Sequence, residues 1–405
     1  MNAICLFIDR LHSGYLGTYG NSWVETPAID RMASQSCVFD SAFIDTPRLR
    51  EVYNSFWQGG HAVLGRESRK QNIALARLLS ENNIHSMLLT DEPSVAQHPL
   101  VQGFDEMAEF RPPEHPSMAA DEGETHLVRC FSRMVEWLES APDSFCLWTH
   151  LSGMNAAWDA PYAFRARFAE ADDPDPPRFV EPPGGILAEE FDPDVLLGVS
   201  QAYAGQVKLL DMCIEGFLEF FAEWSRAEST MIVFASTRGF PLGEHHRVGP
   251  CDDAIYAELV QIPLIVFIPE EDAAGVRGAS LVYPGDVYST VLEWFGVSPT
   301  PGGLIERSLL GEIRGADQSF RDRLCLSGPD GQLGIRTPGW YLRKSSRLEL
   351  FAKPDDRWEV NDVSGRCLDI AEQLENEMNR YINHLQNGTV NDLPDLSPIL
   401  KEGLD

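Results

Sequence analysis

The sequence predicts an α/β fold with a large, mostly parallel sheet flanked by helices, followed by a small C-terminal α+β subdomain with an antiparallel sheet. Two observations support this. Short apolar runs alternate with longer amphipathic stretches along most of the chain. Near the C-terminus, three short runs have the pattern of antiparallel strands. A chain of 405 residues, 43% of them hydrophobic, is long enough to form one large domain and a smaller appendix.

The predicted strands of the large sheet are compact apolar runs, suited to burial on both faces. They are residues 4–8, 86–89, 145–149, 231–235 and 264–268. Thr26 and Pro27 supply an N-cap and a first-turn proline for a helix that runs to about residue 36. Helical periodicity predicts further helices at 72–82, 127–138 and 199–221. Strands that alternate with helices imply a parallel sheet covered on both sides.

We expect two domains, at residues 1–315 and 316–405, because the composition breaks near residues 311–318. Asp, Pro and Glu dominate residues 170–194, which predicts an irregular loop within the first domain. The C-terminal elements are strands at 334–336, 340–343 and 348–351, a helix from about 367 to 385, and a surface tail after 386. Arg343, in the second of these strands, is expected to be exposed.

The chain is strongly acidic, with a net charge of −30 and a pI near 4.6. This charge argues against a nucleic-acid partner, and any anionic ligand requires a local positive pocket. Because no apolar run approaches the ~20 residues that span a bilayer, no membrane association is expected. The eight cysteines form no CxxC pair, several lie in apolar runs, and the first residues already read as a strand rather than a signal peptide. We therefore expect a cytoplasmic protein.

Polar residues follow three of the predicted strands. Asp9 ends the first strand, His150 ends another, and Thr237 and Arg238 end a third. In a doubly wound sheet, ligands bind just beyond the carboxyl ends of the strands. We therefore expect these side chains to line one crevice.

Five segments resemble, in their order and spacing, the sulfatase family of the alkaline-phosphatase-like superfamily. They are residues 3–17, 26–34, 46–47, 236–239 and 242–245. Further segments resemble the family along nearly the whole chain. The resemblance implies an alkaline-phosphatase-like fold and, for an intact member, hydrolysis of sulfate or phosphate esters.

The family's nucleophile is a cysteine or serine in a Cys/Ser-x-Pro-x-Arg motif. Residues 46–47 match the lead-in to this motif, and Gly59 matches the glycine that closes the following helical turn. The resemblance then places Leu49 at the nucleophile position, Glu51 at the motif proline and Tyr53 at the motif arginine. A leucine side chain has no lone pair, so it cannot attack sulfur or phosphorus.

The resemblance also implies a divalent cation, often calcium or magnesium, held by several oxygen ligands. Asp9 matches one ligand position and is vestigial. Arg10, Thr237 and Arg238 occupy the positions of lost ligands, and Asn155 replaces the general-acid histidine. We therefore expect no metal cofactor and no intact set of catalytic residues.

The arginines allow two interpretations. Asp9 is neutralised by Arg10 or Arg238, so that protein charge replaces the metal. Alternatively, Arg10, Arg48, Arg50 and Arg238 form an anion pocket for sulfate or phosphate esters. His12, His61 and His150 are far apart in the sequence. This wide spacing argues against a different metal site built from histidines.

Three functions remain open. The first is a sulfatase-like pseudoenzyme that binds a small anionic ligand or a partner. The second is a metal-free hydrolase of sulfate or phosphate esters, with arginine clamps and His245 or Tyr53 as the base. The third is a metal-dependent sulfatase whose motif lies elsewhere, although none of the eight cysteines stands in such a motif. A protein partner or a homo-oligomer is compatible with all three.

Overall fold

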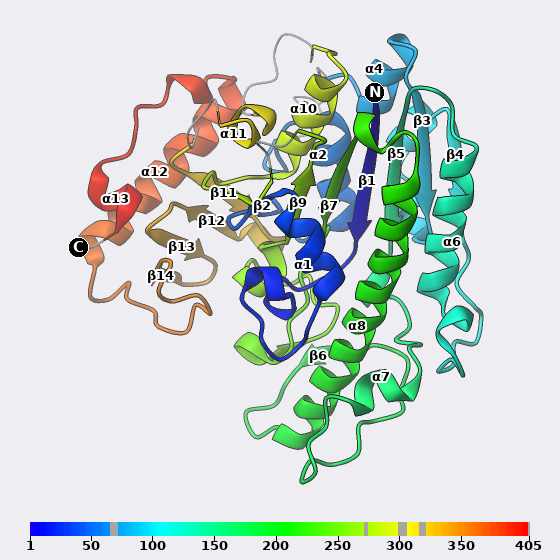
Figure 1. The fold of residues 1–405 in the computed structure, drawn as a ribbon. Coiled ribbons are helices and arrows are strands. Elements are labelled where there is room, and N and C mark those ends of the chain that lie inside the picture. The colour runs from blue at the N-terminus through cyan, green and yellow to red at the C-terminus, as the bar shows by residue number, and fades with distance from the viewer. Residues whose placement is uncertain (65–71, 271–273, 299–305, 316–320, 404–405) are drawn as a thin grey trace. The chain divides into compact units, whose positions relative to one another are not determined.

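The computed structural model describes residues 1–64, 72–270, 274–298, 306–315 and 321–403 (Figure 1). The chain forms two compact units. The first comprises Met1–Val38, Asn83–Cys251 and Ile262–Arg277, and the second comprises Phe39–Asn82, Asp252–Gln261 and Gly278–Asp405. This division differs from the boundary predicted at residue 315, because the C-terminal region packs with two segments from earlier in the chain. The predicted break at 311–318 falls partly on residues 316–320, which lie outside the described residues.

An eight-stranded sheet forms the centre of the first unit, with the strand order β10-β2-β9-β7-β1-β5-β3-β4. Strands β7, β1, β5, β3 and β4 pair in parallel, whereas β9 runs antiparallel to β7. The sheet is therefore mixed and mostly parallel. The five predicted strands are present; β2, β4 and β10 are too short or too exposed to give an apolar run. Their bounds are β1 (Asn2–Ile8), β2 (Cys37–Phe39), β3 (His85–Thr90), β4 (Glu106–Glu109), β5 (Phe145–Leu151), β7 (Thr230–Ala235), β9 (Leu264–Phe267) and β10 (Val276–Gly278).

Strand β1 shows how the centre of the sheet is buried. All seven of its residues are buried, so the strand can only lie between neighbours and between two covered faces. Ile4, Leu6 and Ile8 share one face and join the core cluster with residues of β5 and β7. On the other face Phe7 stacks on Trp148 of β5, with ring centroids 4.7 Å apart.

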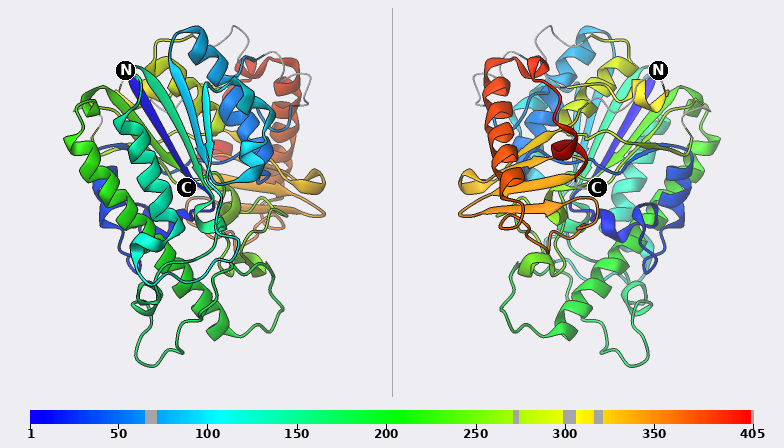
Figure 2. Two further views of the ribbon diagram at one scale, coloured as in Figure 1. Left: turned by 90° about the vertical axis from the view of Figure 1, so that its right-hand side faces the viewer. Right: turned by 90° about the vertical axis from the view of Figure 1, so that its left-hand side faces the viewer.

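Helices α1, α6 and α8 cover the face that carries Ile4 and Leu6 (Figure 2). Thr125 caps α6 by accepting from the Val128 N–H, and Asp192 with Pro193 starts the 31-residue α8. The predicted loop at 170–194 is irregular up to α8, apart from the two-residue strand β6. The remaining elements of this unit are α1 (Pro27–Ser34), α5 (Pro93–Ala96), α6 (His126–Glu139), α7 (Tyr162–Ala166), β6 (Gly185–Ile186), α8 (Pro193–Glu223) and β8 (Arg247–Val248).

The second unit holds a four-stranded antiparallel sheet in the order β11-β12-β13-β14, with α12 against it. The predicted C-terminal strands and helix are confirmed, and β11 is an additional edge strand. Arg343, expected to be exposed, is buried on β13, where it pairs with Glu349 and stacks on Tyr256. The elements are α2 (Leu49–Gln58), α4 (Leu75–Glu81), α9 (Ala257–Val260), α10 (Pro284–Trp294), α11 (Leu310–Ile313), β11 (Leu324–Ser327), β12 (Leu333–Arg336), β13 (Trp340–Lys344), β14 (Leu348–Ala352), α12 (Leu368–Asn387) and α13 (Pro398–Glu402).

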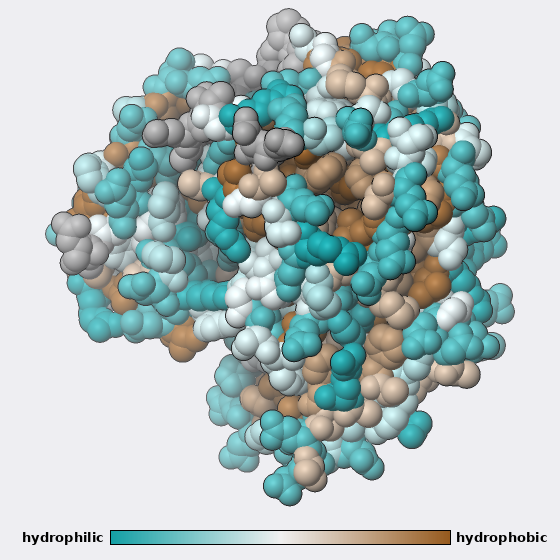
Figure 3. Space-filling view, in the orientation of Figure 1, coloured by the Kyte–Doolittle hydropathy of each residue, from teal (hydrophilic) through white to brown (hydrophobic). Residues whose placement is uncertain are grey.

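Polar residues cover most of the face drawn in Figure 3, interrupted by groups of apolar residues. Of the helices in the described part of the chain, none combines the length and the hydropathy that a bilayer crossing requires. All eight cysteines are free thiols, six of them buried.

Candidate functional site

The carboxyl ends of β1 and β7 bring the predicted crevice residues of the first unit together. Asp9 directly follows β1, and Ser236, Thr237 and Arg238 follow β7, its parallel neighbour. The Ser236 hydroxyl accepts from the Leu11 N–H at 3.0 Å and donates to the Arg238 carbonyl at 2.6 Å. These two bonds fix the turn after β7 against the turn after β1.

Asp9 is fully buried and its carboxylate is bound by protein donors on both oxygens. Arg238 forms a bidentate pair with it, from Nε to Oδ1 at 3.1 Å and from Nη2 to Oδ2 at 2.5 Å. The Thr237 hydroxyl donates to Oδ1 at 2.6 Å. Burial by itself raises the pKa of Asp9, but the charge and hydrogen bonds of Arg238 outweigh it and hold this pKa well below the usual range.

Arg10 lies beside this pair and is also buried, with 2% of its surface exposed. Its backbone is left-handed, with φ of 59°, and the Tyr203 hydroxyl donates to its carbonyl at 2.8 Å. Its Nε donates to the Asn155 side-chain oxygen at 3.1 Å, and its Nη1 to the Gly239 carbonyl at 3.4 Å. Asn155, at the position of the family's general acid, thus serves as an acceptor for a buried guanidinium.

These residues do not fit the divalent cation that the resemblance implies. A hard cation needs several oxygen ligands, usually with more than one charge. Here both oxygens of Asp9 already accept from Thr237 and Arg238, and a second guanidinium from Arg10 lies nearby. A dication about 4 Å from either guanidinium would be repelled by about 8 kcal/mol under an effective dielectric near 20.

His150, the third crevice residue, lies within β5 and is fully buried. Burial lowers its pKa, opposed by the charges of Asp9 and Asp91. The imidazole is therefore close to two carboxylates, one at the end of β1 and one at the end of β3.

Glu244 and His245, the last two residues of the family-like segment 242–245, lie in the 3-10 helix Glu244–His246. Glu244 faces His12, with Oε1 3.7 Å from Nε2, and accepts from the Leu242 N–H at 2.5 Å. Burial alone would raise the pKa of Glu244, but its contacts with His12 and with the Leu242 N–H lower it. His245 is half-buried, in a left-handed conformation with φ of 48°.

The residues predicted from the nucleophile motif belong to the second unit. Leu49 is the first residue of α2 and is 8% exposed; Tyr53 is fully buried in the same helix, 4.3 Å from the Trp57 ring. Arg48 and Arg50, at the start of α2, are exposed. The helix ends at Gly59, as the alignment with the family motif predicts, with φ of 66°.

His61 also lies in the second unit, where its Nε2 is 2.8 Å from the Cys325 carbonyl oxygen. His12 accepts from the Gly14 N–H through Nδ1 at 2.8 Å. Neither belongs to the group of metal-ligating side chains that the described residues contain.

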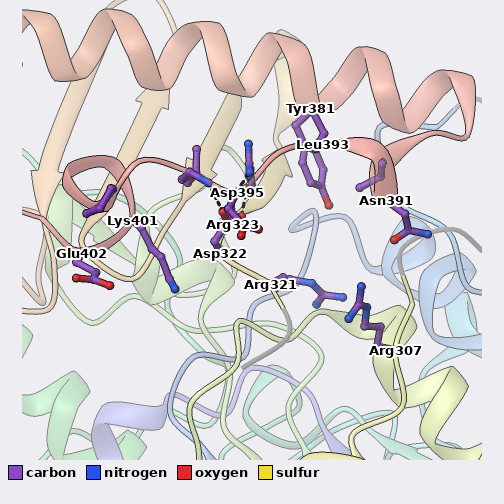
Figure 4. Close-up of a pocket in the computed structure, with 13 residues that line it drawn as sticks. Arg307, Arg321, Asp322, Arg323, Tyr381, Asn391, Leu393, Asp395, Lys401 and Glu402 are labelled. Carbon is purple, nitrogen blue, oxygen red and sulfur yellow. Dashed lines mark hydrogen bonds and ion pairs between the residues drawn. The ribbon is translucent and has the colours of Figure 1, made fainter. Parts of the chain in front are cut away.

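A cavity of about 470 Å³ lies in the second unit (Figure 4). Its basic side chains are Arg307, Arg321, Arg323 and Lys401. Arg321 forms a bidentate pair with Asp286, and Arg323 binds Asp322 and Glu377. Because carboxylates already engage two of its cations, this cavity lacks the positive excess that an anion pocket requires.

The sequence interpretation missed one polar cluster in the first unit, formed by Asp91, His126 and Cys130. Two signals were visible in the sequence. Asp91 lies two residues after the predicted strand 86–89, and His126 lies four residues before Cys130, directly before the helix predicted from residue 127.

Comparisons with known proteins bear on both the fold and the family. Over 96% of this chain and 96% of its own, the phosphonate monoester hydrolase of Agrobacterium radiobacter superposes with a TM-score of 0.79 at 14% identity. A protein solved in complex with its substrate D-glucosamine-2-N,6-O-disulfate superposes with a TM-score of 0.78 at 16% identity, over 97% of this chain and 99% of its own. At these identities the likeness shows the fold alone.

The relatives found by sequence comparison include two described proteins. The multifunctional alkaline phosphatase superfamily protein PehA of Trinickia caryophylli is 34% identical over 113 residues, which is 27% of this chain and only 21% of PehA. Iduronate 2-sulfatase of Homo sapiens is 22% identical over 81% of this chain and 72% of its own length. A sequence model of the family described as Sulfatase matches residues 1–297. The chain therefore belongs to the sulfatase family, as its motifs predict.

Proposed function

We propose that this chain is a non-hydrolytic member of the sulfatase family that binds a small anionic ester and does not turn it over. The observation that carries the proposal is the bidentate pair between Arg238 and Asp9, which occupies the one metal ligand that remains. A guanidinium has donors only, so it can neutralise Asp9 but cannot take part in metal coordination.

The other parts of the family's chemistry are replaced as well. Leu49, at the nucleophile position, has no lone pair, and Asn155, at the general-acid position, is hydrogen-bonded to Arg10 and has no proton to give to a leaving group. Nucleophile, metal and acid act as a unit in ester hydrolysis, and all three are affected.

Anion binding is supported by the charge of the buried cluster. Arg10 and Arg238 place two buried guanidinium groups beside the single carboxylate of Asp9. The structural relatives include a phosphonate monoester hydrolase and a protein that takes a sulfated sugar as its substrate. A sulfate or phosphate ester is therefore the ligand class that we propose.

The hydrolysis test uses aryl sulfate, aryl phosphate and phosphonate monoesters, with and without added calcium. We expect no turnover above the buffer rate and no stoichiometric calcium or magnesium in protein purified without chelators. Saturable hydrolysis that persists through repurification and disappears in His245→Ala would instead favour the metal-free hydrolase. Tyr53 is the weaker candidate for its base, since the side chain is fully buried.

The binding test measures the melting temperature in the presence of sulfate or phosphate, each variant being compared with its own ligand-free value. We expect the anion to raise the melting temperature of the wild type and to have no effect on Arg10→Gln. The matched control is Arg133→Gln, because the Arg133 side chain on α6 is 65% exposed. An equal gain in all three proteins would show that the anion acts elsewhere.

A further inference from the structure

Three potential metal ligands converge in the first unit, and none of them belongs to the Asp9 and Arg238 pair. Asp91 directly follows β3, and His126 and Cys130 lie four residues apart on α6, on the same face of the helix. The His126 Nε2 is 2.9 Å from Asp91 Oδ2 and 3.5 Å from Cys130 Sγ. The donor atoms all lie within 4.8 Å of one another.

The arrangement differs from a catalytic Cys-His-Asp relay. In such a relay the thiol approaches one imidazole nitrogen and the carboxylate holds the other. Here the thiol and the carboxylate both approach Nε2 of His126. One ring nitrogen carries at most one proton, so it cannot satisfy both neighbours by donation. A cation at the point where the three atoms converge would satisfy all of them.

The distances and the donor types fit zinc best. Zn²⁺ binds nitrogen, oxygen and sulfur at about 2.0–2.3 Å, which keeps tetrahedral ligand atoms about 3.3–3.6 Å apart. The separation of 3.5 Å between Nε2 and Sγ lies in this range, whereas the 2.9 Å separation between Nε2 and Oδ2 must widen slightly. Thiolate and imidazole select zinc over calcium or magnesium, which prefer oxygen ligands alone.

Burial and charge also favour a cation. Asp91 and Cys130 are each 3% exposed. A second carboxylate, Asp159, accepts from the His126 backbone N–H at 2.7 Å through Oδ2. In the described residues, its Oδ1 is buried without a hydrogen-bond partner, and the only ion pair of Asp91 is with His126. Two buried carboxylates thus bind His126, Asp91 at the imidazole and Asp159 at the backbone N–H, and a divalent cation would neutralise their negative charge.

The surroundings hold the ligands in place. The Ser152 backbone N–H, just beyond β5, donates to Asp91 Oδ1 at 2.6 Å and leaves Oδ2 directed at His126. Burial raises the pKa of the Cys130 thiol, and the charges of Asp91 and Asp159 raise it further. A bound cation reverses this balance, because a coordinating thiol is deprotonated.

We propose that Asp91, His126 and Cys130 form a zinc site, with Asp159 beside it as the acceptor that positions His126 and as a candidate fourth donor. This site is distinct from the hard-cation position at Asp9 and does not depend on the proposed function. The expectation that the chain uses no metal then applies to the family's cation position only.

Cobalt titration of the reduced, metal-free protein tests the proposal, because Co²⁺ takes zinc sites and reports its ligands by absorption. We expect about one equivalent of Co²⁺ per chain, with a thiolate-to-cobalt charge-transfer band in the near ultraviolet and visible bands of tetrahedral intensity. Zinc should displace the cobalt and abolish the bands. A wild type that binds neither ion, or binds cobalt without the charge-transfer band, would overturn the proposal.

Variants locate the site. Cys130→Ser should lose the charge-transfer band, and His126→Gln should lower the cobalt affinity at least tenfold. The control is Cys251→Ser, which removes a partly exposed thiol from the same unit and should leave the titration unchanged. Asp159→Asn should weaken binding by about 10–100-fold, the usual effect of losing a group that supports a metal ligand. A band retained in Cys130→Ser would place the cobalt on another cysteine and contradict the assignment.

Discussion

Asp9 and Asp91 are two carboxylates with the same origin in the fold and different partners. Each directly follows a strand of the parallel part of the sheet, β1 for Asp9 and β3 for Asp91, and both are buried. Asp9 meets the guanidinium of Arg238, whereas Asp91 meets the imidazole of His126, with a thiol beside it. A guanidinium closes a carboxylate to metals, because it is permanently charged and has no lone pair. Imidazole and thiol leave lone pairs available, so the second carboxylate keeps the capacity to bind a cation.

The largest expected effect comes from removing the cation that neutralises Asp9. Arg238→Met leaves a buried carboxylate without its bidentate partner, so we expect it to lower the free energy of unfolding by about 3–5 kcal/mol. Cys130→Ser in the metal-free protein removes only a neutral thiol and should cost much less. Chemical denaturation measures both values.

The control for this experiment is Arg133→Ala, at an exposed position on α6, where the expected change is within about 0.5 kcal/mol. Arg343 is unsuitable as a control, since it is buried and paired with Glu349. Equally small effects of Arg238→Met and Arg133→Ala would show that Arg238 does not stabilise the buried Asp9 carboxylate.

A smaller effect is expected from acid. The pKa of Asp9 is lower in the folded protein than in the unfolded chain, where an aspartate has a pKa of about 3.9. The ion pair therefore contributes its full stability above that pH, and the contribution is lost as the pH falls further toward the folded pKa. Asp9→Asn should be less stable than the wild type by a constant amount at neutral pH, and this difference should narrow below about pH 4.

The difference in the free energy of unfolding between the wild type and Asp9→Asn separates the contribution of Asp9 from that of other groups with lowered pKa values, such as Glu244 and Asp362. Denaturation curves between neutral pH and the acid limit of folding provide the measurement. A gap that stays constant into strong acid would contradict the ion-pair assignment.

The sequence predicts most of the fold because its strands are apolar runs and its motifs keep their order. All five predicted strands of the large sheet are present, and the C-terminal antiparallel strands and helix follow the prediction. The two-unit division could not be read from the sequence. It depends on contacts between the C-terminal region and residues 39–82, which only the folded chain brings together.

The candidate site is predicted unevenly. Asp9, Thr237 and Arg238 meet because parallel strands β1 and β7 end at one edge. The hydrogen bond between Arg10 and Asn155 joins positions 145 residues apart, so no local sequence pattern predicts it. The pair of His126 and Cys130, by contrast, has the spacing of one helical turn in the sequence, whereas its contact with Asp91 depends on the packing of α6 against the sheet.

The smallest expected effect is that of restoring the family nucleophile alone. Leu49→Cys places a thiol at the first residue of α2, where the family motif has its cysteine or serine. We expect no turnover of aryl sulfates or phosphates, because the acidic ligand at Asp9 stays paired with Arg238 and Asn155 stays bonded to Arg10. When catalytic groups act as a unit, repairing one of them yields almost no activity. Added zinc should not change this result, since the proposed zinc ligands include neither Asp9 nor Arg238. Hydrolysis that appears in Leu49→Cys and is absent from the wild type would contradict this expectation. It would mean that the ion pair with Arg238 does not prevent Asp9 from binding a metal, so that Asp9, like Asp91, would keep the capacity to bind a cation.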